Sequence, residues 1–230
     1  MSTAHNYTQH WDEKFRSRTW GRYPPEDLVR FMGRNFKRAD KSEVRVLEIG
    51  CGPGANVWFL HREGYAVSAI DASPTAIALA SERLQIENKD CKSPVPDLKI
   101  GNFQKLPWQD NQFDVVVDIF ALYANTHDVI SMALTEISRV LKPGGFFYTK
   151  LWGTATTGFG EGKKLETATF DDISSGPCCN MGVSHFFTHT EIEKLFGIFF
   201  TPLAIDVISR SDVTAKQQIE EFHCQFKKAT

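Results

Sequence analysis

The feature that most constrains the fold is a glycine-rich turn between a strand pattern and a helix pattern. Residues 44–49 (Val-Arg-Val-Leu-Glu-Ile) are typical of a strand, and they run directly into Gly50-Cys51-Gly52-Pro53-Gly54. The residues that follow predict a helix over 55–63 that ends at Gly64. Glycines let the backbone turn sharply and approach a ligand, and the N-terminus of the next helix attracts an anionic group. This unit predicts an α/β fold with a ligand site.

The same alternation of strand and helix continues along the chain. Further strands are expected at 66–70, 98–100, 113–119 and 146–152. Helices are expected from Pro25 to Lys37-Arg38, from Ser73-Pro74 to Leu84, and from a cap at Asp128 to Val140. Strands that alternate with helices in this way form a doubly wound, parallel sheet that binds ligands at the carboxyl ends of its strands.

The pattern changes after residue 152. Residues 153–184 are rich in Gly, Thr and Ser without a clear period, so we expect a long functional loop. A capping box at Thr190 predicts a helix to Gly197, and residues 199–208 are typical of a strand. Ile219, Phe222 and Phe226 have the spacing of a last helix.

Composition restricts the possible functions. The 230 residues are 42% hydrophobic and 23% charged, which fits a soluble domain, and 18 Phe, 5 Trp and 5 Tyr are too many for a disordered chain. A net charge of −2 gives no general attraction to nucleic acid or anionic lipid. We therefore expect no membrane partner and regard nucleic acid as an unlikely one.

The compartment follows from processing signals and cysteines. Residues 1–8 lack the basic and apolar regions of a signal peptide, and no run reaches the ~18 apolar residues of a membrane span. Five cysteines, an odd number without a C-x-x-C pair, indicate reduced thiols. A cytoplasmic location is expected.

The glycines alone fit two cofactors. Gly50-x-Gly52-x-x-Ala55 also satisfies the dinucleotide pattern, and Asp71 follows Gly50 by 21 residues, where either ribose would need a carboxylate. Glu48, two residues before the first glycine, and the additional Gly54 favour a different pattern. A nicotinamide-dependent oxidoreductase remains the alternative.

Two later motifs complete that pattern: Phe113-Asp114 at the start of a strand, and Leu141-Lys142-Pro143-Gly144-Gly145 before the next strand. With them, the sequence resembles the class I S-adenosylmethionine-dependent methyltransferases, in particular small bacterial-type members that act on small molecules. The resemblance spans residues 43–152 and, more loosely, 185–209.

The resemblance implies a single domain over residues 1–230. Its fold would be a Rossmann-like, seven-stranded, mostly parallel sheet with an antiparallel last strand, helices on both faces and a lid insertion, with strands six and seven within 185–210. The implied parts are an N-terminal cap (1–42), a cofactor-binding core (43–152), a lid loop (153–184), and C-terminal strands and a helix (185–230).

The resemblance also implies which residues bind S-adenosyl-L-methionine, and S-adenosyl-L-homocysteine as product. Glu48 and Asp118 would lie near the amino group of the cofactor, and Asp71 would accept both ribose hydroxyls. Asn102, where the family usually has Asp, would accept from the adenine amino group, and Phe103 would pack beside adenine. The remaining implied cofactor-binding residues are Gly50, Cys51, Gly52, Gly54, Ala72 and, from the N-terminal segment, Trp20.

Four of these residues have a purely structural alternative. Glu48 could cap the loop, and Asp71 could pair with the helix that begins at Ser73. Phe103 could be ordinary core, and Asp118 could be a buried carboxylate bonded to the backbone.

The acceptor side is less defined. Tyr123 and His127 follow the 113–119 strand, where the family places groups that face the transferred methyl, and they are the catalytic candidates; His185 is a further candidate for substrate contact. Methyl transfer from a sulfonium is an in-line displacement in which positioning supplies most of the rate, so a general base is optional. The expected acceptor is O or N of a small molecule.

Other functions find less support. Cys178, Cys179, His185 and His189 lie close in sequence, but the two histidines do not share a helix face, and no metal is expected. The basic residues form isolated pairs, and the Asn-Pro-Pro-Tyr segment of enzymes that methylate amino groups of nucleic acids is absent after the 113–119 strand. A protein that binds the cofactor without turnover is a further alternative, and the chain is expected to be a monomer or a homodimer.

Overall fold

The structure is a computed structural model that describes residues 3–37, 40–88, 91 and 93–229. The chain divides into two compact units. The first comprises Met1–Trp108 and Gln112–Val117, and the second comprises Gln109–Asn111 and Asp118–Thr230.

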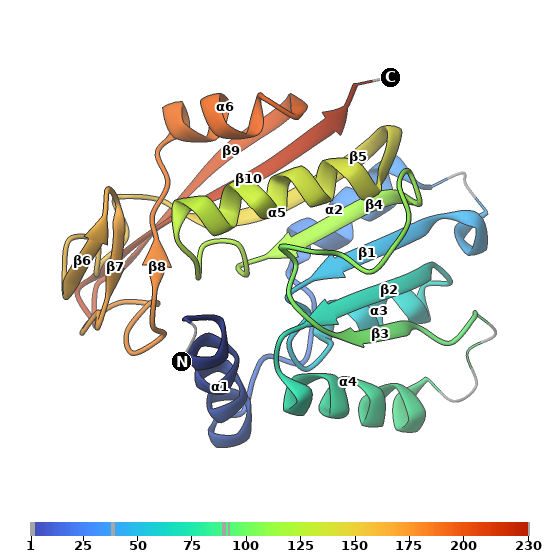
Figure 1. The fold of residues 1–230 in the computed structure, drawn as a ribbon, viewed down its shortest axis with the longest axis horizontal. Coiled ribbons are helices and arrows are strands. Elements are labelled where there is room, and N and C mark those ends of the chain that lie inside the picture. Colours follow the sequence, from blue (N-terminus) through green and yellow to red (C-terminus); the bar gives the residue numbers. More distant parts are fainter. Residues whose placement is uncertain (1–2, 38–39, 89–90, 92, 230) are drawn as a thin grey trace. The chain divides into compact units, whose positions relative to one another are not determined.

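The first unit contains three parallel strands in the order β3-β2-β1 (Figure 1). These are β1 (Arg45–Ile49), β2 (Ala66–Asp71) and β3 (Asp97–Ile100). Its helices are α1 (Thr3–Ser17), α2 (Glu26–Asn35), the short 3₁₀ helix η1 (Lys41–Glu43), α3 (Ala55–Arg62) and α4 (Pro74–Glu87). Ile49 pairs with Ile70, and Asp71 pairs with Ile100, so the carboxyl ends of the three strands lie at one edge.

Local sequence explains where these helices begin and end. The hydroxyl of Ser73 accepts from the N–H of Ala76, and Pro74 occupies the first turn, so α4 begins as predicted. Helix α2 ends at Asn35, before the expected Lys37-Arg38 stretch, and Arg38 lies outside the described residues.

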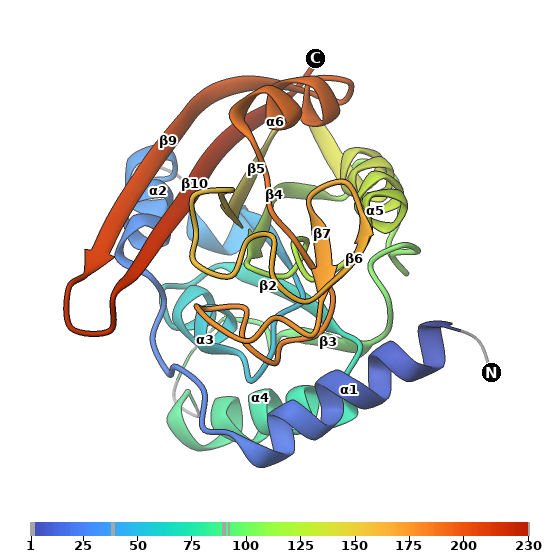
Figure 2. The same ribbon diagram turned by 90° about the vertical axis from the view of Figure 1, so that its left-hand side faces the viewer.

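The second unit contains three antiparallel strands in the order β5-β10-β9 (Figure 2). These are β5 (Leu141–Trp152), β9 (Phe200–Asp212) and β10 (Gln217–Lys228). Its helices are α5 (His127–Val140) and α6 (His189–Phe196). A smaller sheet has the order β6-β7-β8, formed by β6 (Lys163–Glu166), β7 (Thr169–Asp171) and β8 (Ser184–His185).

Strand β4 (Phe113–Ile119) crosses the division between the units and completes the sheet, whose strand order is β3-β2-β1-β4-β5-β10-β9. The predicted α/β class, with seven strands and antiparallel pairing at the end of the chain, is confirmed. No helix among the described residues is long and apolar enough to cross a membrane.

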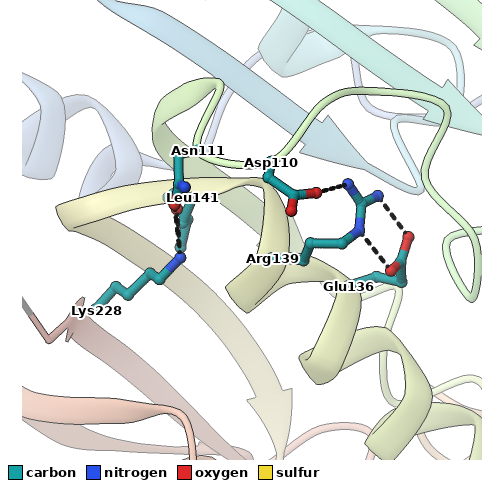
Figure 3. Close-up of polar contacts among 6 residues, drawn as sticks. All are labelled: Asp110, Asn111, Glu136, Arg139, Leu141 and Lys228. Carbon is teal, nitrogen blue, oxygen red and sulfur yellow. Dashed lines mark hydrogen bonds and ion pairs between the residues drawn. The ribbon is translucent and has the colours of Figure 1, made fainter.

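A hydrogen-bonded cluster ties the short segment Gln109–Asn111 to the rest of the second unit (Figure 3). Lys228 Nζ donates to Asn111 Oδ1 (3.0 Å) and to the carbonyl of Leu141 (2.8 Å). Arg139 donates to Glu136 and to Asp110, and these carboxylates raise the pKa of the guanidinium. The end of β10 is thereby fixed to the start of β5.

The prediction of a last helix is wrong. Ile219, Phe222 and Phe226 lie on strand β10, and the predicted strands six and seven lie at 200–212 and 217–228 rather than within 185–210. Phe222, Cys224 and Phe226 are buried two residues apart, which is the spacing of a strand. The predicted helix rested on Ile219, Phe222 and Phe226 alone, and the spacing of these three residues also suits a helix.

The expected loop over residues 153–184 is also not a single loop. It contains β6 and β7, which form the small sheet with β8. Strands of three and four residues are too short to produce a periodic pattern, so the sequence did not indicate them.

Two helix caps differ from expectation by one or two residues. Helix α5 begins at His127 with Thr126 as its N-cap, so Asp128 lies in the first turn. Helix α6 is capped by Thr188, whose hydroxyl accepts from the N–H of Glu191 (3.2 Å), and Thr190 lies inside the helix.

Candidate functional site

The glycine loop after β1 has the geometry that a ligand-binding turn requires. Gly50, Gly52 and Gly54 have φ values of 61°, 50° and 78°, a region that favours glycine. A Cβ added at Gly54 would lie 2.7 Å from Ala80 Cβ, and one at Gly52 would lie 3.3 Å from the Phe15 ring. A side chain at Gly54 would therefore force the loop and α4 apart, whereas one at Gly52 would require only a small movement of the Phe15 ring.

Asp71, at the end of β2, holds this loop. Its Oδ2 accepts from the N–H of Gly52 (2.8 Å) and its Oδ1 from the N–H of Ser73 (2.9 Å). The hydrogen bond from Ser73, the N-cap of α4, is the contact that the structural alternative for Asp71 predicted. Each carboxylate oxygen has a second lone pair, so both can still accept from a vicinal diol.

Burial alters the acidity of this carboxyl group. Desolvation raises the pKa of Asp71 from 3.8 to about 6, against the opposing effect of the backbone hydrogen bonds from Ser73 and Gly52. The neighbouring Cys51 is also buried, and burial together with the charges of Asp71 and Glu48 raises the pKa of its thiol. Cys51 is thus a protonated packing residue of the loop at neutral pH.

Glu48 lies buried on β1 and connects the strand to the helix after the glycine loop. Its Oε1 accepts from Asn56 Nδ2 (2.7 Å) in the first turn of α3. This hydrogen bond gives Glu48 a structural role, which the sequence left open as an alternative to cofactor binding. The predicted role near the cofactor amino group stays a prediction.

The candidates for the adenine side differ in exposure. Asn102 is exposed, and its Oδ1 accepts from the N–H of Gln104 (2.8 Å) while its Nδ2 donates to Gln104 Oε1 (2.7 Å). Phe103 is buried, and Ala72 is half-buried directly after Asp71. The acceptor oxygen of Asn102 therefore already has a local partner, which any contact to adenine would share.

Trp20 belongs to an aromatic group on the N-terminal segment. Its ring centroid lies 4.9 Å from that of Phe15, the residue that packs against Gly52, and 6.3 Å from that of Trp11. Its Nε1 donates to the carbonyl of Lys14 at 3.5 Å. The N-terminal segment thus reaches the glycine loop through Phe15.

A carboxylate that sequence reasoning missed fastens α1 to the same region. Asp12 Oδ1 accepts from the Ser73 hydroxyl (2.6 Å) and from the N–H of Thr75 (2.9 Å), and Oδ2 pairs with Arg16 (2.7 Å). The hydrogen bond from Ser73 lowers the pKa of Asp12. No spacing rule indicates a contact between residues 12 and 73, so no sequence signal could have found it.

In the second unit, Asp118 organises the loop that follows β4. The side chain is fully buried; Oδ1 accepts from the N–H groups of Ala121 (2.9 Å) and Leu122 (3.1 Å), and Oδ2 from the Thr149 hydroxyl (2.6 Å). Burial raises the pKa of Asp118 to about 6. These contacts match the structural alternative of a buried, backbone-bonded carboxylate.

The loop held by Asp118 carries an aromatic cluster. Phe120, with a φ of 55°, stacks on Trp152 with ring centroids 4.0 Å apart and planes at 16°. Tyr123 is buried and meets the Trp152 ring edge-on at 6.1 Å. Trp152 Nε1 is buried and has no hydrogen-bond partner among the described residues. Sequence reasoning missed Phe120 and Trp152, although Trp152 ends one predicted strand and Phe120 directly follows another.

His127 and His185 have different environments in this unit. His127 is exposed at the start of α5, and its backbone N–H donates to Glu166 Oε1 (2.6 Å). His185 is buried; its Nδ1 contacts Thr169 Oγ1 (2.7 Å) and its Nε2 contacts Glu191 Oε1 (2.8 Å). The backbone N–H of His185 donates to the carbonyl of Tyr123 (2.7 Å), so His185 supports the Tyr123 loop.

The cysteine and histidine candidates for a metal site do not assemble. Cys178 is buried and its pKa is raised to about 12 by burial, while Cys179 Sγ donates to the carbonyl of Ser174 (3.2 Å). Among the residues that the structure describes, no group of three or more His, Cys, Asp or Glu side chains could hold a metal ion.

The seven-stranded fold, the glycine loop and the acidic residue at the end of β2 together define a class I S-adenosylmethionine-dependent methyltransferase. The methyl donor of this class is S-adenosyl-L-methionine. Residues 47–149 match the family described as a methyltransferase domain.

Two curated relatives are similar over part of the chain. The tRNA N(3)-cytidine methyltransferase METTL2 of Gallus gallus is 30% identical over 162 residues, which cover 67% of this chain and 42% of that protein. The probable phthiotriol/phenolphthiotriol dimycocerosates methyltransferase 2 of Mycobacterium ulcerans is 33% identical over 126 residues, which cover 54% and 45%. The chain thus spans less than half the length of either relative.

A solved structure is similar over most of the chain. The SAM-dependent methyltransferase of Methanosarcina mazei has a TM-score of 0.71 at 22% identity, with 90% of this chain and 99% of that one covered. At this identity the likeness concerns the fold.

Proposed function

We propose that this chain transfers a methyl group from S-adenosyl-L-methionine to O or N of a small-molecule acceptor by in-line displacement. The observation that carries the proposal is the hydrogen bond from the N–H of Gly52 to the buried carboxylate of Asp71, in a loop whose three glycines have positive φ and which lies at the carboxyl end of the strands. When bound, the cofactor supplies a methyl group activated by a positively charged sulfur.

The residues of the first unit fit that cofactor. Three of the five loop residues, Gly50, Gly52 and Gly54, have no side chain to obstruct a close ligand, and the Asp71 oxygens retain lone pairs for a ribose diol. A nicotinamide dinucleotide remains the competing ligand, because the same glycines suit its phosphates.

The aromatic cluster of the second unit supports a small, flat or apolar acceptor. Phe120 and Trp152 present stacked rings, and the Trp152 indole N–H is a donor without a partner among the described residues. A ligand that accepts this hydrogen bond would satisfy a buried donor, whose desolvation otherwise costs about 1–3 kcal/mol. We assign Tyr123 to orienting the acceptor, with His127 as the second catalytic candidate.

A tRNA base is the second candidate acceptor, because the METTL2 relative of Gallus gallus is named for tRNA cytidine methylation. The net charge of −2 gives this chain no general attraction to a polyanion. A sensor that binds the cofactor without turnover is the third possibility, and a cytoplasmic location stays a prediction.

Two experiments separate these functions. Calorimetric titration should detect binding of S-adenosyl-L-homocysteine and none of NADH; the reverse result would reject the methyltransferase assignment. Transfer of a labelled methyl group should then be measured in parallel to a small-molecule library and to total tRNA. Label in tRNA alone would replace the small-molecule acceptor by RNA, and cofactor binding without label in either pool would support a sensor.

A further inference from the structure

Strand β9 ends the main sheet with a long, exposed edge. It runs for thirteen residues, and β10 is its only neighbour in the strand order of the described chain (Figure 2). Every residue from Asp206 to Asp212 is exposed, including Val207 (50%) and Ile208 (45%). Both faces of this part of β9 are therefore accessible.

An edge of this kind invites pairing with another strand. Backbone N–H and C=O groups on the outer side of β9 have no ladder partner among the described residues. Proteins usually shorten, bend or cover such edges, because they are templates for β-sheet extension. The outer edge of β9 is long and carries exposed Val and Ile, so it has the properties of an interaction surface.

The regular part of this edge has defined limits. A bulge at Leu203 interrupts the pairing with β10, since Ala204 pairs with Gln225 while Pro202 pairs with Phe226. The strand ends at Asp212, where the turn begins. The regular edge is therefore residues 204–212, and its midpoint is Ile208.

Symmetry restricts how two copies of this edge can pair. In an antiparallel ladder, the backbone N–H and C=O groups of two facing residues either both point toward the other strand or both point away from it, and these two kinds of pair alternate along the strand. In a symmetric pair of strands, one residue must therefore face its own copy, and the two-fold axis passes midway between them. An axis at Ile208 uses the whole regular edge. It places Asp206 of each copy opposite Arg210 of the other, which gives two such pairs. An axis at Val207 places Asp206 opposite Ile208, and an axis at Ser209 places Asp206 opposite Asp212.

We propose that this chain forms a homodimer in which the β9 edges of two copies pair antiparallel about Ile208. The paired Ile208 side chains and the two Asp206–Arg210 ion pairs set the register. Opposite charges that face each other across strands stabilise a ladder, and like charges destabilise it, so the charge sequence of the edge selects this register over its neighbours. The inference is independent of the methyl acceptor.

Sedimentation equilibrium on the full chain tests this dimer. The wild type should be dimeric, whereas Arg210→Asp and Asp206→Arg should each raise the dimer dissociation constant at least tenfold, because each places like charges opposite one another. An equimolar mixture of the two variants should form heterodimers, because at both ladder positions an arginine of the Asp206→Arg copy then faces an aspartate of the Arg210→Asp copy. The double variant Asp206→Arg/Arg210→Asp restores opposite charges at both positions and should dimerise like the wild type. Lys105→Asp reverses an exposed charge in the first unit and should leave the dimer unchanged.

Cross-linking gives a second measurement that does not depend on the charge variants. Ile208→Cys should form a disulfide-linked dimer on mild oxidation, since the two Cβ atoms face each other. Ser211→Cys, on the same exposed strand, should not, because its copy lies about six residues away along the ladder. A wild type that stays monomeric at its highest soluble concentration, absence of heterodimers in the mixture, or equal cross-linking of both variants would overturn the proposal.

Discussion

Thr149 on β5 donates its hydroxyl hydrogen to Asp118 over 2.6 Å and so links this strand to the loop that carries the aromatic cluster. Both residues are fully buried. The contact connects the stability of the second unit to the placement of Tyr123, because the other Asp118 oxygen holds the N–H groups of Ala121 and Leu122.

Replacing Thr149 by Val should destabilise the protein by about 1–3 kcal/mol at pH 7.5, because a buried carboxylate loses a hydrogen-bond donor. Thr149→Ser keeps the hydroxyl and should lose less. At pH 5 the deficit of Thr149→Val should shrink, since Asp118, with a pKa of about 6, is then mostly protonated. Urea unfolding at the two pH values measures this, and equal losses for Val and Ser would show that the hydroxyl does not matter.

The two buried aspartates should make the protein more stable as the pH falls from about 6 to about 4. Burial raises the pKa of Asp71 and of Asp118 from 3.8 to about 6. Between pH 6 and 4 the folded state therefore binds more protons than the unfolded state, and the free energy of unfolding rises as the pH falls. Each carboxyl contributes on the order of 2 kcal/mol over this window.

Urea unfolding of the wild type and of Asp118→Asn from pH 4.5 to pH 8 measures this dependence. Asp118→Asn cannot take up the proton, so its stability should vary less with pH than that of the wild type. Parallel pH profiles for the two proteins would contradict the assignment to Asp118.

Gly54→Ala should destabilise the protein more than Gly160→Ala does. Gly54 and Gly160 both have positive φ, 78° and 83°, but only at Gly54 does an added Cβ meet another residue, 2.7 Å from Ala80 Cβ. Gly160→Ala should cost about 1–2 kcal/mol from backbone strain alone. Gly54→Ala should cost about 1–3 kcal/mol more. Chemical denaturation measures both, and equal losses would mean that the loop moves away from α4 freely.

Asp71→Asn should weaken binding of S-adenosyl-L-homocysteine by about 1–3 kcal/mol, because charge-assisted hydrogen bonds to the ribose are lost. The matched control is Asp172→Asn, an exposed position with a φ of 57° that asparagine tolerates. Titration calorimetry gives the two affinities. Unchanged affinity in Asp71→Asn would place the ribose elsewhere.

Tyr123→Phe should lower kcat for the acceptor while leaving the affinity for S-adenosyl-L-homocysteine within a factor of about two. The reason is that removal of one orienting or basic hydroxyl acts on the transfer step. Tyr23→Phe, at an exposed tyrosine of the first unit, is the control. Steady-state rates with the acceptor from the screen, together with calorimetry, provide the two readouts. Full activity would remove Tyr123 from the catalytic candidates.

The sequence predicted the first half of the fold well because its signals are local. The Ser73-Pro74 cap and the glycine turn each act within a few residues, and both form as expected. Strand β10 was missed because burial of Phe222, Cys224 and Phe226 depends on the strands beside it, which no spacing along the chain reveals.

The same distinction applies to the candidate site. Asp71 and the glycines were found from their order and spacing, whereas the contact of Asp12 with Ser73 joins residues 61 positions apart. The stacking of Phe120 on Trp152 likewise depends on how the ends of β4 and β5 lie in space. Spacing predicts contacts within one turn or one βαβ unit, and these two contacts lie beyond that range.

The place of β10 has a consequence for how the protein is made. Residues 217–228 form the strand that lies between β5 and β9, and both neighbours are synthesised before it. Until the ribosome has released these residues, the β5 and β9 segments lack their shared partner, and chaperones or proteases can reach their exposed edges. A premature stop codon that removes only this short stretch would therefore leave the whole second unit without its centre.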